Sequence, residues 1–287
     1  MTSTQRVVVV TGASSGLGKA TAKALAAQGW RVIALGRDPQ RCAAAQAEIK
    51  QAAAASDVDM VRADLGLMAE VARAAQEVAV LTDRVDVLIN NAGAIGTGQV
   101  ITADGHEQTF AADYLGPFLF TLRLLPLLRR AAADAPPGSV RILMTSSGVS
   151  WTVPGLDWDD LQMFRDFDPL AAYSRAKLAN ILFTCGLAKR LAGDGIVAHA
   201  MNPGAVETNF FNQVEGGPRA ALAGFDVLTP EEGADTLVWL ATAEEAGRTT
   251  GEFFFKRKAR RAHPFVDDAS VERMWVESEK LLASPGA

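Results

Sequence analysis

The sequence predicts an α/β protein: a single domain with a doubly wound, mainly parallel sheet of seven strands and helices on both faces. Short valine- and isoleucine-rich runs recur along the chain, alanine-rich helical stretches separate them, and a glycine-rich turn directly follows the first run. Apolar strands that alternate with helices are typical of a parallel sheet that is buried on both faces. No internal repeat or linker marks a second domain.

The expected strands are short apolar runs, and the expected helices lie between and after them. We expect strands at Val7–Val10, Arg31–Leu35, Asp57–Ala63, Val85–Asn90, Val140–Thr145, Ile196–Met201 and Glu252–Phe255. The principal helices are expected up to Ala26 and near Arg41–Ala54, Thr102–Ala132, Leu170–Leu191, Glu231–Ala241 and Asp268–Leu282. Two irregular segments, Val149–Asp168 and Asn202–Leu228, interrupt this order, and the second is long enough to be a functional lid.

The composition is that of an ordinary globular protein and argues against several classes of function. The chain has 287 residues, of which 49% are hydrophobic, and its net charge of −5 indicates neither a nucleic-acid nor a membrane-surface partner. Its two cysteines, Cys42 and Cys185, give no disulfide framework, which fits a reducing cytosol. The three histidines lack metal-ligand spacing. We therefore expect a cytoplasmic protein without a metal.

The longest apolar stretch, Tyr114–Leu128, is interrupted by glycine, proline and arginine. A helix that spans a bilayer needs about 20 consecutive apolar residues, so we expect a buried core helix here and no membrane span. The polar segment Met1–Arg6 leads straight into the first strand and does not resemble a secretory leader.

The glycine-rich turn after the first strand is a candidate phosphate-binding site. It reads TGASSGLG over residues 11–18, and a helix follows it. Glycine lets the backbone approach a pyrophosphate closely, and the free N–H groups of the helix N-terminus then face the anion. A P-loop is excluded because Lys19 is followed by Ala20; a glycine turn without a ligand stays the alternative. The candidate contacts are Gly12, Ser14, Ser15, Gly16, Leu17 and Gly18.

Polar residues and glycines also follow the third, fourth and sixth expected strands. Ligands of doubly wound sheets sit beyond the carboxyl ends of the strands, where these residues gather. Asp64 can contact an adenine ring, and the segment after Pro203 can hold a nicotinamide carboxamide. Ordinary turn chemistry is the alternative for each of these strand ends. The candidate cofactor contacts here are Asp64, Leu65, Asn91, Ala92, Gly93, Pro203, Gly204, Val206 and Thr208.

The end of the second strand predicts which dinucleotide is bound. An acidic side chain there bonds the ribose 2′-OH of NAD, whereas an arginine accommodates the 2′-phosphate of NADP. Gly36 stands where the acid is expected, and Arg37 follows it. Asp38 is the competing acid, but Asp38-Pro39 is typical of a helix N-cap followed by proline at the first helical position. We therefore expect NADP(H) in preference to NAD(H), with a solvated surface charge as the alternative role of Arg37.

Tyr173 and Lys177 are the candidate catalytic pair. Residues four apart lie on the same face of a helix, so the ammonium comes close to the phenol. A nearby cation favours the phenolate and lowers the tyrosine pKa from its usual value of about 10. Tyr173 can then exchange a proton with an oxygen while a hydride moves at carbon, and Lys177 can also bond the nicotinamide ribose. One of the two serines after the fifth strand, Ser146 or Ser147, can hold the substrate oxygen. An ordinary surface pair and a turn serine are the alternatives.

Taken together, these motifs resemble the short-chain dehydrogenase/reductase family over nearly the whole chain. TGASSGLG is similar to the family's cofactor turn, NNAG to its fourth-strand motif, YSRAK to its Tyr-x-x-x-Lys motif and NPGAVET to its Pro-Gly segment. The resemblance implies a Rossmann-type fold, with Tyr173 as general acid/base, Lys177 as its activator and Ser147 as oxyanion partner. Residues 1–145 would mainly bind the cofactor, and residues 146–287 would carry catalysis and substrate binding. Many members are dimers or tetramers, so a homodimer or homotetramer is expected.

Finer features are similar to the retinol-dehydrogenase-like and protochlorophyllide-reductase-like branches. They are the long interval between Ser147 and Tyr173, the SRAKLAN segment and the ending TPEEGADTL…GEFFFKRKARR. The first branch implies NADP-linked interconversion of bulky hydrophobic carbonyls and alcohols, and the second implies reduction of a ring double bond. A non-catalytic dinucleotide sensor or scaffold on the same fold is the rival class, although the presence of Tyr173 and Lys177 argues against it.

One position departs from the family's pattern. Where the family usually has asparagine, in a stretch like Val-Asn-His-Leu-Gly, this chain reads Ala112-Asp-Tyr-Leu-Gly116. The asparagine supports a proton relay with the lysine. Asp113 has no amide donor and adds a negative charge, which would partly cancel the pull of Lys177 on Tyr173. We therefore include Asp113 among the candidate catalytic residues.

Substrate contacts are expected from the two irregular segments, where apolar and aromatic side chains suit a bulky apolar substrate. Packing of these side chains within their own segments is the alternative. The candidates are Val149, Trp151, Val153, Leu156, Phe210, Phe211, Leu222, Phe225 and Leu228. The basic run Lys256–Arg261 is expected to form a solvated tail beyond the last strand, with an anionic partner as the less favoured alternative.

Overall fold

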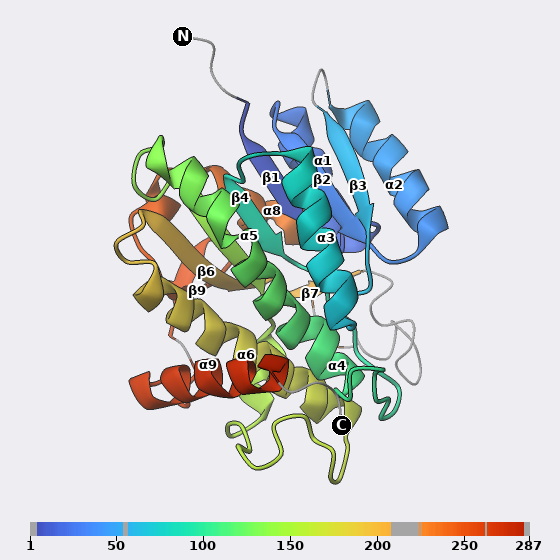
Figure 1. Cartoon of the computed structure of the whole chain (residues 1–287), viewed down its shortest axis with the longest axis vertical. Coiled ribbons are helices and arrows are strands. Elements are labelled where there is room, and N and C mark those ends of the chain that lie inside the picture. Colours follow the sequence, from blue (N-terminus) through green and yellow to red (C-terminus); the bar gives the residue numbers. More distant parts are fainter. Residues whose placement is uncertain (1–4, 54–56, 208–223, 225, 262, 284–287) are drawn as a thin grey trace.

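A central sheet of eight strands organises the chain (Figure 1). The computed structural model describes residues 5–53, 57–207, 224, 226–261 and 263–283. The sheet order is β10-β9-β6-β5-β4-β1-β2-β3, and every neighbouring pair is parallel except β10 with β9. The strands are β1 Val7–Val10, β2 Arg31–Gly36, β3 Val58–Arg62, β4 Val87–Asn90, β5 Val140–Thr145, β6 Ile196–Asn202, β9 Glu252–Phe255 and β10 Lys258–Arg260.

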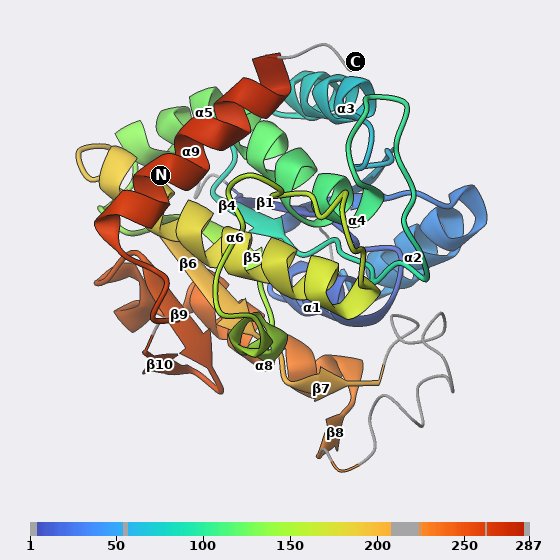
Figure 2. The same ribbon diagram turned by 90° about the horizontal axis from the view of Figure 1, so that it is seen from below.

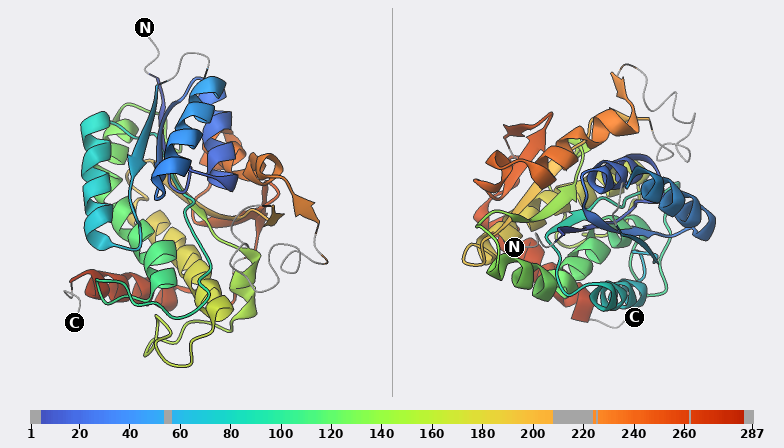
Figure 3. Two further views of the ribbon diagram at one scale, coloured as in Figure 1. Left: turned by 90° about the vertical axis from the view of Figure 1, so that its right-hand side faces the viewer. Right: turned by 90° about the horizontal axis from the view of Figure 1, so that it is seen from above.

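Helices cover both faces of the sheet (Figure 3), and each face has its own apolar core. One core joins the sheet to α1 (Gly16–Ala27), α2 (Pro39–Ala52) and α8 (Pro230–Thr242). The other joins it to α3 (Met68–Leu81), α5 (Gly116–Ala133), α6 (Pro169–Arg190) and α9 (Asp268–Ala283). All four valines of β1 are buried because this central strand is covered on both faces. The predicted doubly wound α/β fold is confirmed.

The strand order creates a crevice at the carboxyl ends of the strands. β1 pairs with β2 on one side and with β4 on the other, so the chain continues to opposite sides of β1. Such a point, where the strand order reverses, is where open α/β sheets bind ligands. The glycine turn after β1 and the residues that follow β4 and β5 therefore meet in one place, toward which the arrowheads of β3 and β4 point in Figure 1.

The basic run near the C-terminus forms an eighth strand, so the expectation of a tail and of seven strands was wrong in this detail. Lys256 and Arg257 have positive φ values of 51° and 59°, as two-residue hairpin turns require. β10 then pairs antiparallel with β9, Lys258 opposite Phe255. Backbone pairing accounts for the difference, since the side chains of β10 stay exposed as expected.

The long helix expected over Thr102–Ala132 begins later than its apolar pattern predicts. Ile101 pairs with Glu107 across a turn, and the short helix α4 (Gln108–Phe110) begins only there. The Glu107 side chain caps α4 by accepting from the N–H groups of Thr109 and Phe110. A π-helical segment, η1 (Ala111–Leu115), then leads into α5.

The helical run Gln108–Ala133 is long and apolar enough, by length and composition, to cross a membrane, but 67% of its most apolar window is buried inside the structure. Its aromatic residues contact those of α6 and α9. Phe118, for example, lies 4.8 Å from Phe183 and 5.1 Å from Trp275 between ring centroids. This packing is that of the buried core helix that the sequence predicts. Figure 2 shows α9 lying across α5 and α6.

Candidate active site

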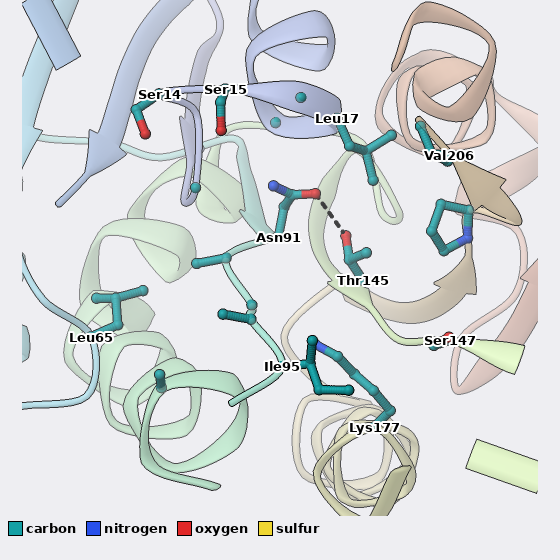
Figure 4. A pocket seen from close by; sticks show the side chains of 18 of the residues that line it. Ser14, Ser15, Leu17, Leu65, Asn91, Ile95, Thr145, Ser147, Lys177 and Val206 are labelled. Atoms are coloured by element: carbon teal, nitrogen blue, oxygen red, sulfur yellow. Dashed lines mark hydrogen bonds between the residues drawn. The ribbon is translucent and has the colours of Figure 1, made fainter. Parts of the chain in front are cut away.

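A pocket of about 390 Å³ lies at the carboxyl ends of the strands. Its walls come from the turn after β1, the ends of β2 to β6, the segment after β6 and the first turns of α6. Figure 4 shows Ser14 and Ser15 at one end of the pocket and Ser147 and Lys177 at the other. Segments that are far apart in the sequence thus meet around one elongated space.

The glycine turn has the close backbone contacts that a pyrophosphate cradle needs. Gly12 and Gly16 have positive φ values of 68° and 51°, and a Cβ at Gly18 would lie 2.4 Å from the Gly12 carbonyl oxygen. Ser15 is the N-cap of α1, and its side chain makes no capping bond among the described residues. The N–H groups of the first turn of α1 therefore face the pocket as anion donors, and the turn fits a dinucleotide. All six residues predicted for this contact line the pocket: Gly12, Ser14, Ser15, Gly16, Leu17 and Gly18.

At the end of β2, two arginines line the pocket. One is the predicted Arg37, and the other is Arg41 in the first turn of α2. The sequence reasoning missed Arg41, although a basic residue in the first turn of the helix that follows β2 could have indicated it. Asp38 caps α2 by accepting from the Arg41 N–H at 2.8 Å, which confirms its predicted role.

The ends of β3 and β4 supply the next part of the wall. Leu65, Asn91, Ala92 and Gly93 line the pocket as predicted. Asp64 does not appear among the described residues that line it; its carboxylate accepts from the Gly66 N–H at 2.9 Å and pairs with Arg37.

Asn91 ties this wall to two neighbouring strands. Its side chain donates to the Thr11 carbonyl oxygen at 3.0 Å. Its Oδ1 accepts from Thr145 at the end of β5 at 3.3 Å, the bond drawn in Figure 4. Thr145 also lines the pocket, and the sequence reasoning missed it.

The segment after β6 closes the opposite side. Pro203, Gly204 and Val206 line the pocket as predicted, and Val206 lies in the two-residue strand β7 (Ala205–Val206). β7 pairs with β8 (Val227–Leu228). The predicted contact Thr208 lies outside the described residues.

The candidate catalytic residues meet at the inner end of the pocket. Tyr173 and Lys177 lie in α6, whose first turn is capped by Asp168, and both are buried. Ser147 is the N-cap of η2 (Gly148–Thr152), and a hydrogen bond joins its side chain to Tyr173. Lys177 Nζ lies 5.1 Å from the centre of the Tyr173 ring. The structure therefore brings the three predicted residues together.

Ser146, which precedes Ser147, has a different position. Its hydroxyl donates to the Lys177 carbonyl oxygen at 2.7 Å and is buried. This bond joins the end of β5 to the middle of α6. Ser146 therefore sets the distance between the strand that carries Ser147 and the helix that carries Lys177, a role that the sequence reasoning did not identify.

The electrostatics of Tyr173 differ from the sequence expectation. Burial raises the pKa of its phenol, the Asp113 carboxylate raises it further, and the hydrogen bond with Ser147 acts in the opposite direction. The phenol pKa is therefore raised, mainly by burial, and not lowered as the Tyr173–Lys177 pair alone predicts. Lys177 is paired with Asp113, Nζ to Oδ2 3.0 Å, as expected for an aspartate at this position. Burial also raises the pKa of the Asp113 carboxyl.

The substrate end has fewer of the predicted contacts. Val149 lines the pocket, together with Ile95 and Leu170, which were not predicted. Val153 and Leu156 were wrongly placed there, since both are buried in the main apolar core. Val153 and Leu156 thus pack the irregular segment Val149–Asp168 against the rest of this core.

The remaining substrate candidates contact other parts of the chain or are not described. Trp151 packs on His263, with ring centroids 5.1 Å apart, and Leu228 contacts the backbone region of Gly204 from β8. Neither is among the described residues that line the pocket. Four further candidates lie outside the described residues: Phe210, Phe211, Leu222 and Phe225.

Comparison with known proteins identifies relatives along nearly the whole chain. The short chain dehydrogenase family matches residues 6–159. Human "Retinol dehydrogenase 13" is 35% identical over 96% of this chain and 84% of its own length. Human "Polyprenol dehydrogenase" is 33% identical over 95% of this chain and 84% of its own length.

Solved structures with dinucleotides share the fold. A Pseudomonas aeruginosa "RhlG/NADP active-site complex" has a TM-score of 0.69 and 27% identity, over 87% of this chain and 93% of that one. The 3-ketoacyl-(acyl-carrier-protein) reductase from Brucella melitensis, complexed with NADH, has a TM-score of 0.68 and 26% identity, over 87% of this chain and 95% of that one. With the glycine cradle described above, these likenesses identify a site for a nicotinamide dinucleotide. The chain belongs to the short chain dehydrogenase family, in its retinol-dehydrogenase-like branch, and is an oxidoreductase that acts on CH–OH groups.

Proposed function

We propose that this enzyme interconverts bulky hydrophobic ketones or aldehydes and the corresponding alcohols with NADP(H), and that Tyr173 is its general acid/base. The observation that carries the proposal is the hydrogen-bonded pair of Tyr173 and Ser147 at the inner end of the pocket. During the reaction the substrate oxygen gains or loses a proton, which one hydroxyl can exchange with it. A second hydroxyl beside the first can donate a hydrogen bond to that oxygen and stabilise its charge.

The bound nicotinamide supplies or accepts the hydride. Tyr173 gives its proton to the carbonyl oxygen in reduction and takes it from the alcohol in oxidation. Ser147 donates a hydrogen bond to the same oxygen and supports the charge that develops on it. Lys177, which lines the pocket, would hold the nicotinamide ribose by donating to its hydroxyl groups. The residues of the glycine turn hold the pyrophosphate.

The preference for NADP(H) is supported by the end of β2. A Cβ at Gly36 would lie 2.7 Å from both Cys42 Sγ and Ser14 Cβ, so an acidic side chain that bonds a ribose 2′-OH does not fit there. Asp38 is engaged as the cap of α2. Arg37 and Arg41 line the same part of the pocket and present two guanidinium groups to a 2′-phosphate.

The apolar substrate is supported by the side chains near Tyr173. Ile95, Val149 and Leu170 line this end of the pocket, and Leu170 is 50% exposed at its mouth. Such a lining favours a bulky apolar group beside the reacting carbon. The relatives named for retinol and polyprenol act on alcohols of that kind.

The test is NADPH oxidation, followed by its absorbance, with a panel of bulky and small ketones and aldehydes. We expect turnover of the bulky apolar members and its loss in Tyr173→Phe, which keeps the ring and removes the proton. Faster turnover of small polar substrates such as sugars would contradict the substrate class. If NADPH binds but no carbonyl of the panel reacts with the wild-type protein, the proposed carbonyl substrates are wrong.

A further inference from the structure

A buried ion pair joins the helix of Tyr173 to the π-helical segment η1. Lys177 Nζ lies 3.0 Å from Asp113 Oδ2, with side-chain exposures of 2% and 0%. The other carboxylate oxygen, Asp113 Oδ1, accepts from the Ala94 N–H at 2.9 Å. Because both side chains are almost fully buried, each charge acts on neighbouring groups with little screening.

Two backbone features, the π-helical segment η1 and the glycine at position 93, accommodate this ion pair. Asp113 is the central residue of η1, and single π-helical turns recur at functional sites because they re-aim one side chain. A Cβ at Gly93 would lie 2.8 Å from Lys177 Nζ and 3.0 Å from Asp113 Oδ2. The pair therefore lies directly against the wall of the pocket, which Gly93 and Lys177 both line.

Few charged groups act on the Tyr173 hydroxyl in the part of the chain that the structure describes. Lys177, on the same helix, lies near the Tyr173 ring, and the charge of Asp113 in η1 acts on the hydroxyl. Ser147, the N-cap of η2, is neutral and forms a hydrogen bond with Tyr173. Burial raises the pKa of Glu107, the N-cap of α4, and the nearby Asp113 carboxylate adds to this increase. The Glu107 carboxylate accepts from the backbone N–H groups of Thr109 and Phe110, whereas Lys177 pairs with Asp113.

We propose that Asp113 neutralises Lys177 and thereby keeps Tyr173 protonated, so that the enzyme donates a proton in carbonyl reduction up to alkaline pH and oxidises alcohols efficiently only at alkaline pH. This inference rests on the proposed function and assigns its pH range. An ammonium alone would stabilise the phenolate, whereas an ammonium–carboxylate pair has no net charge and does so weakly. Asp113 is thus a positioning residue that acts on Tyr173 by its own charge and by its pairing with Lys177.

The two directions of the reaction need opposite forms of Tyr173. In reduction, the carbonyl carbon gains the hydride of the reduced nicotinamide, the oxygen takes the phenol proton, and the resulting phenolate regains a proton from water. In oxidation, the phenolate takes the alcohol proton as the hydride leaves the carbon. Raising the phenol pKa therefore extends reduction to higher pH and moves the onset of oxidation to higher pH.

The first experiment compares the pH profiles of wild type and Asp113→Asn. The amide keeps the size and the acceptor for Ala94 and removes the negative charge. We expect the pH of half-maximal kcat for alcohol oxidation to fall by about one unit or more in the variant. The pH at which kcat for carbonyl reduction declines on the alkaline side should fall by a similar amount. Coincident profiles would overturn the proposal.

A spectroscopic titration tests the same point without activity. The chain contains two tyrosines, Tyr114 and Tyr173, so subtracting Tyr173→Phe from wild type isolates the tyrosinate absorbance of Tyr173. The double variant Asp113→Asn/Tyr173→Phe is the blank for Asp113→Asn. We expect tyrosinate to appear at a lower pH once Asp113 is neutral. Its appearance at the same pH in both proteins, or in neither below their alkaline unfolding, would contradict the proposal even if the substrate is unknown.

Glu107→Gln is the matched control, because it removes a neighbouring buried carboxylate that does not pair with Lys177. The pH profile of kcat for Glu107→Gln should stay close to that of wild type. A shift as large as that of Asp113→Asn would show that any negative charge in this region raises the pKa of Tyr173, and that the ion pair has no special role. If Asp113→Asn does not fold, Asp113→Ala should give the same direction of shift. Failure to find any substrate would refute the proposed function but leave the titration decisive for Asp113.

Discussion

Arg37, which follows β2, pairs with Asp64, which follows β3, with Nη1 3.4 Å from Oδ2. Arg37 lines the pocket and is more than half exposed, so a bound anion can draw it away from Asp64 at little cost. Arg41 approaches the same region from α2. The two arginines, one partly held by Asp64, are thus available for a phosphate on the adenosine ribose.

Removing these guanidinium groups should weaken NADPH binding selectively. We expect Arg37→Ala to raise the Kd for NADPH about tenfold or more, because a charge-assisted hydrogen bond contributes about 1.5–3 kcal/mol. Arg41→Ala should add to this loss, while the Kd for NADH stays nearly unchanged. Titration of cofactor fluorescence measures both constants. Arg248→Ala, an exposed arginine paired with Glu244, is the control. Equal losses for NADPH and NADH would refute the 2′-phosphate contact.

Gly36 should resist replacement because the space around it is filled. The Cβ of Gly36→Ala would meet Cys42 Sγ and Ser14 Cβ at 2.7 Å, so we expect a loss of about 1–3 kcal/mol in the free energy of unfolding. Denaturant unfolding measures it, and Cys42→Ala in the same chain should recover part of the loss. Gly98→Ala is the control, since a Cβ at Gly98 meets nothing within 4 Å. Similar losses at Gly36 and Gly98 would argue against the steric explanation.

The two adjacent serines should separate catalysis from stability. Ser147→Ala should lower kcat about a hundredfold or more, with little change in cofactor affinity, because it removes a donor to the reacting oxygen. Ser146→Ala should instead lower the free energy of unfolding by about 1 kcal/mol, because it removes a buried bond to Lys177. Steady-state kinetics and denaturant unfolding of both variants test the distinction. A loss of kcat in Ser146→Ala and a loss of stability in Ser147→Ala would contradict these roles.

Stability should fall as the solution becomes mildly acidic. Burial lowers the pKa of His199 in the folded chain, whereas an unfolded histidine titrates near pH 6.5. Below about pH 6.5 the unfolded state therefore binds more protons, and the free energy of unfolding decreases with falling pH. We expect His199→Gln to flatten this decrease between about pH 7 and about pH 5. Parallel curves for the two proteins would show that other groups cause the pH dependence.

The sequence predicts the cofactor half of the site well because its signals are local. A glycine turn after a buried strand, or an Asp-Pro cap, depends on conformations that neighbouring residues determine. The six residues of the glycine turn all line the pocket, and Asp38 caps its helix. The substrate half is predicted less well, since an apolar residue in an irregular segment suits a pocket and a core equally. Val153 and Leu156 pack into the core, while Ile95 and Leu170 line the pocket.

By itself the sequence determined the α/β fold, the order of its strands along the chain and the spacing of Tyr173 and Lys177, because periodicity and turn chemistry act over a few residues. The family resemblance placed Asp113 near Lys177, but only the tertiary structure decided that the two form a direct, buried ion pair. Asp113 and Lys177 are far apart in the chain, and their contact depends on the packing of η1 against α6 and on the glycine at position 93. That packing buries both side chains, and this makes the pair, instead of Lys177 alone, the charge that Tyr173 experiences.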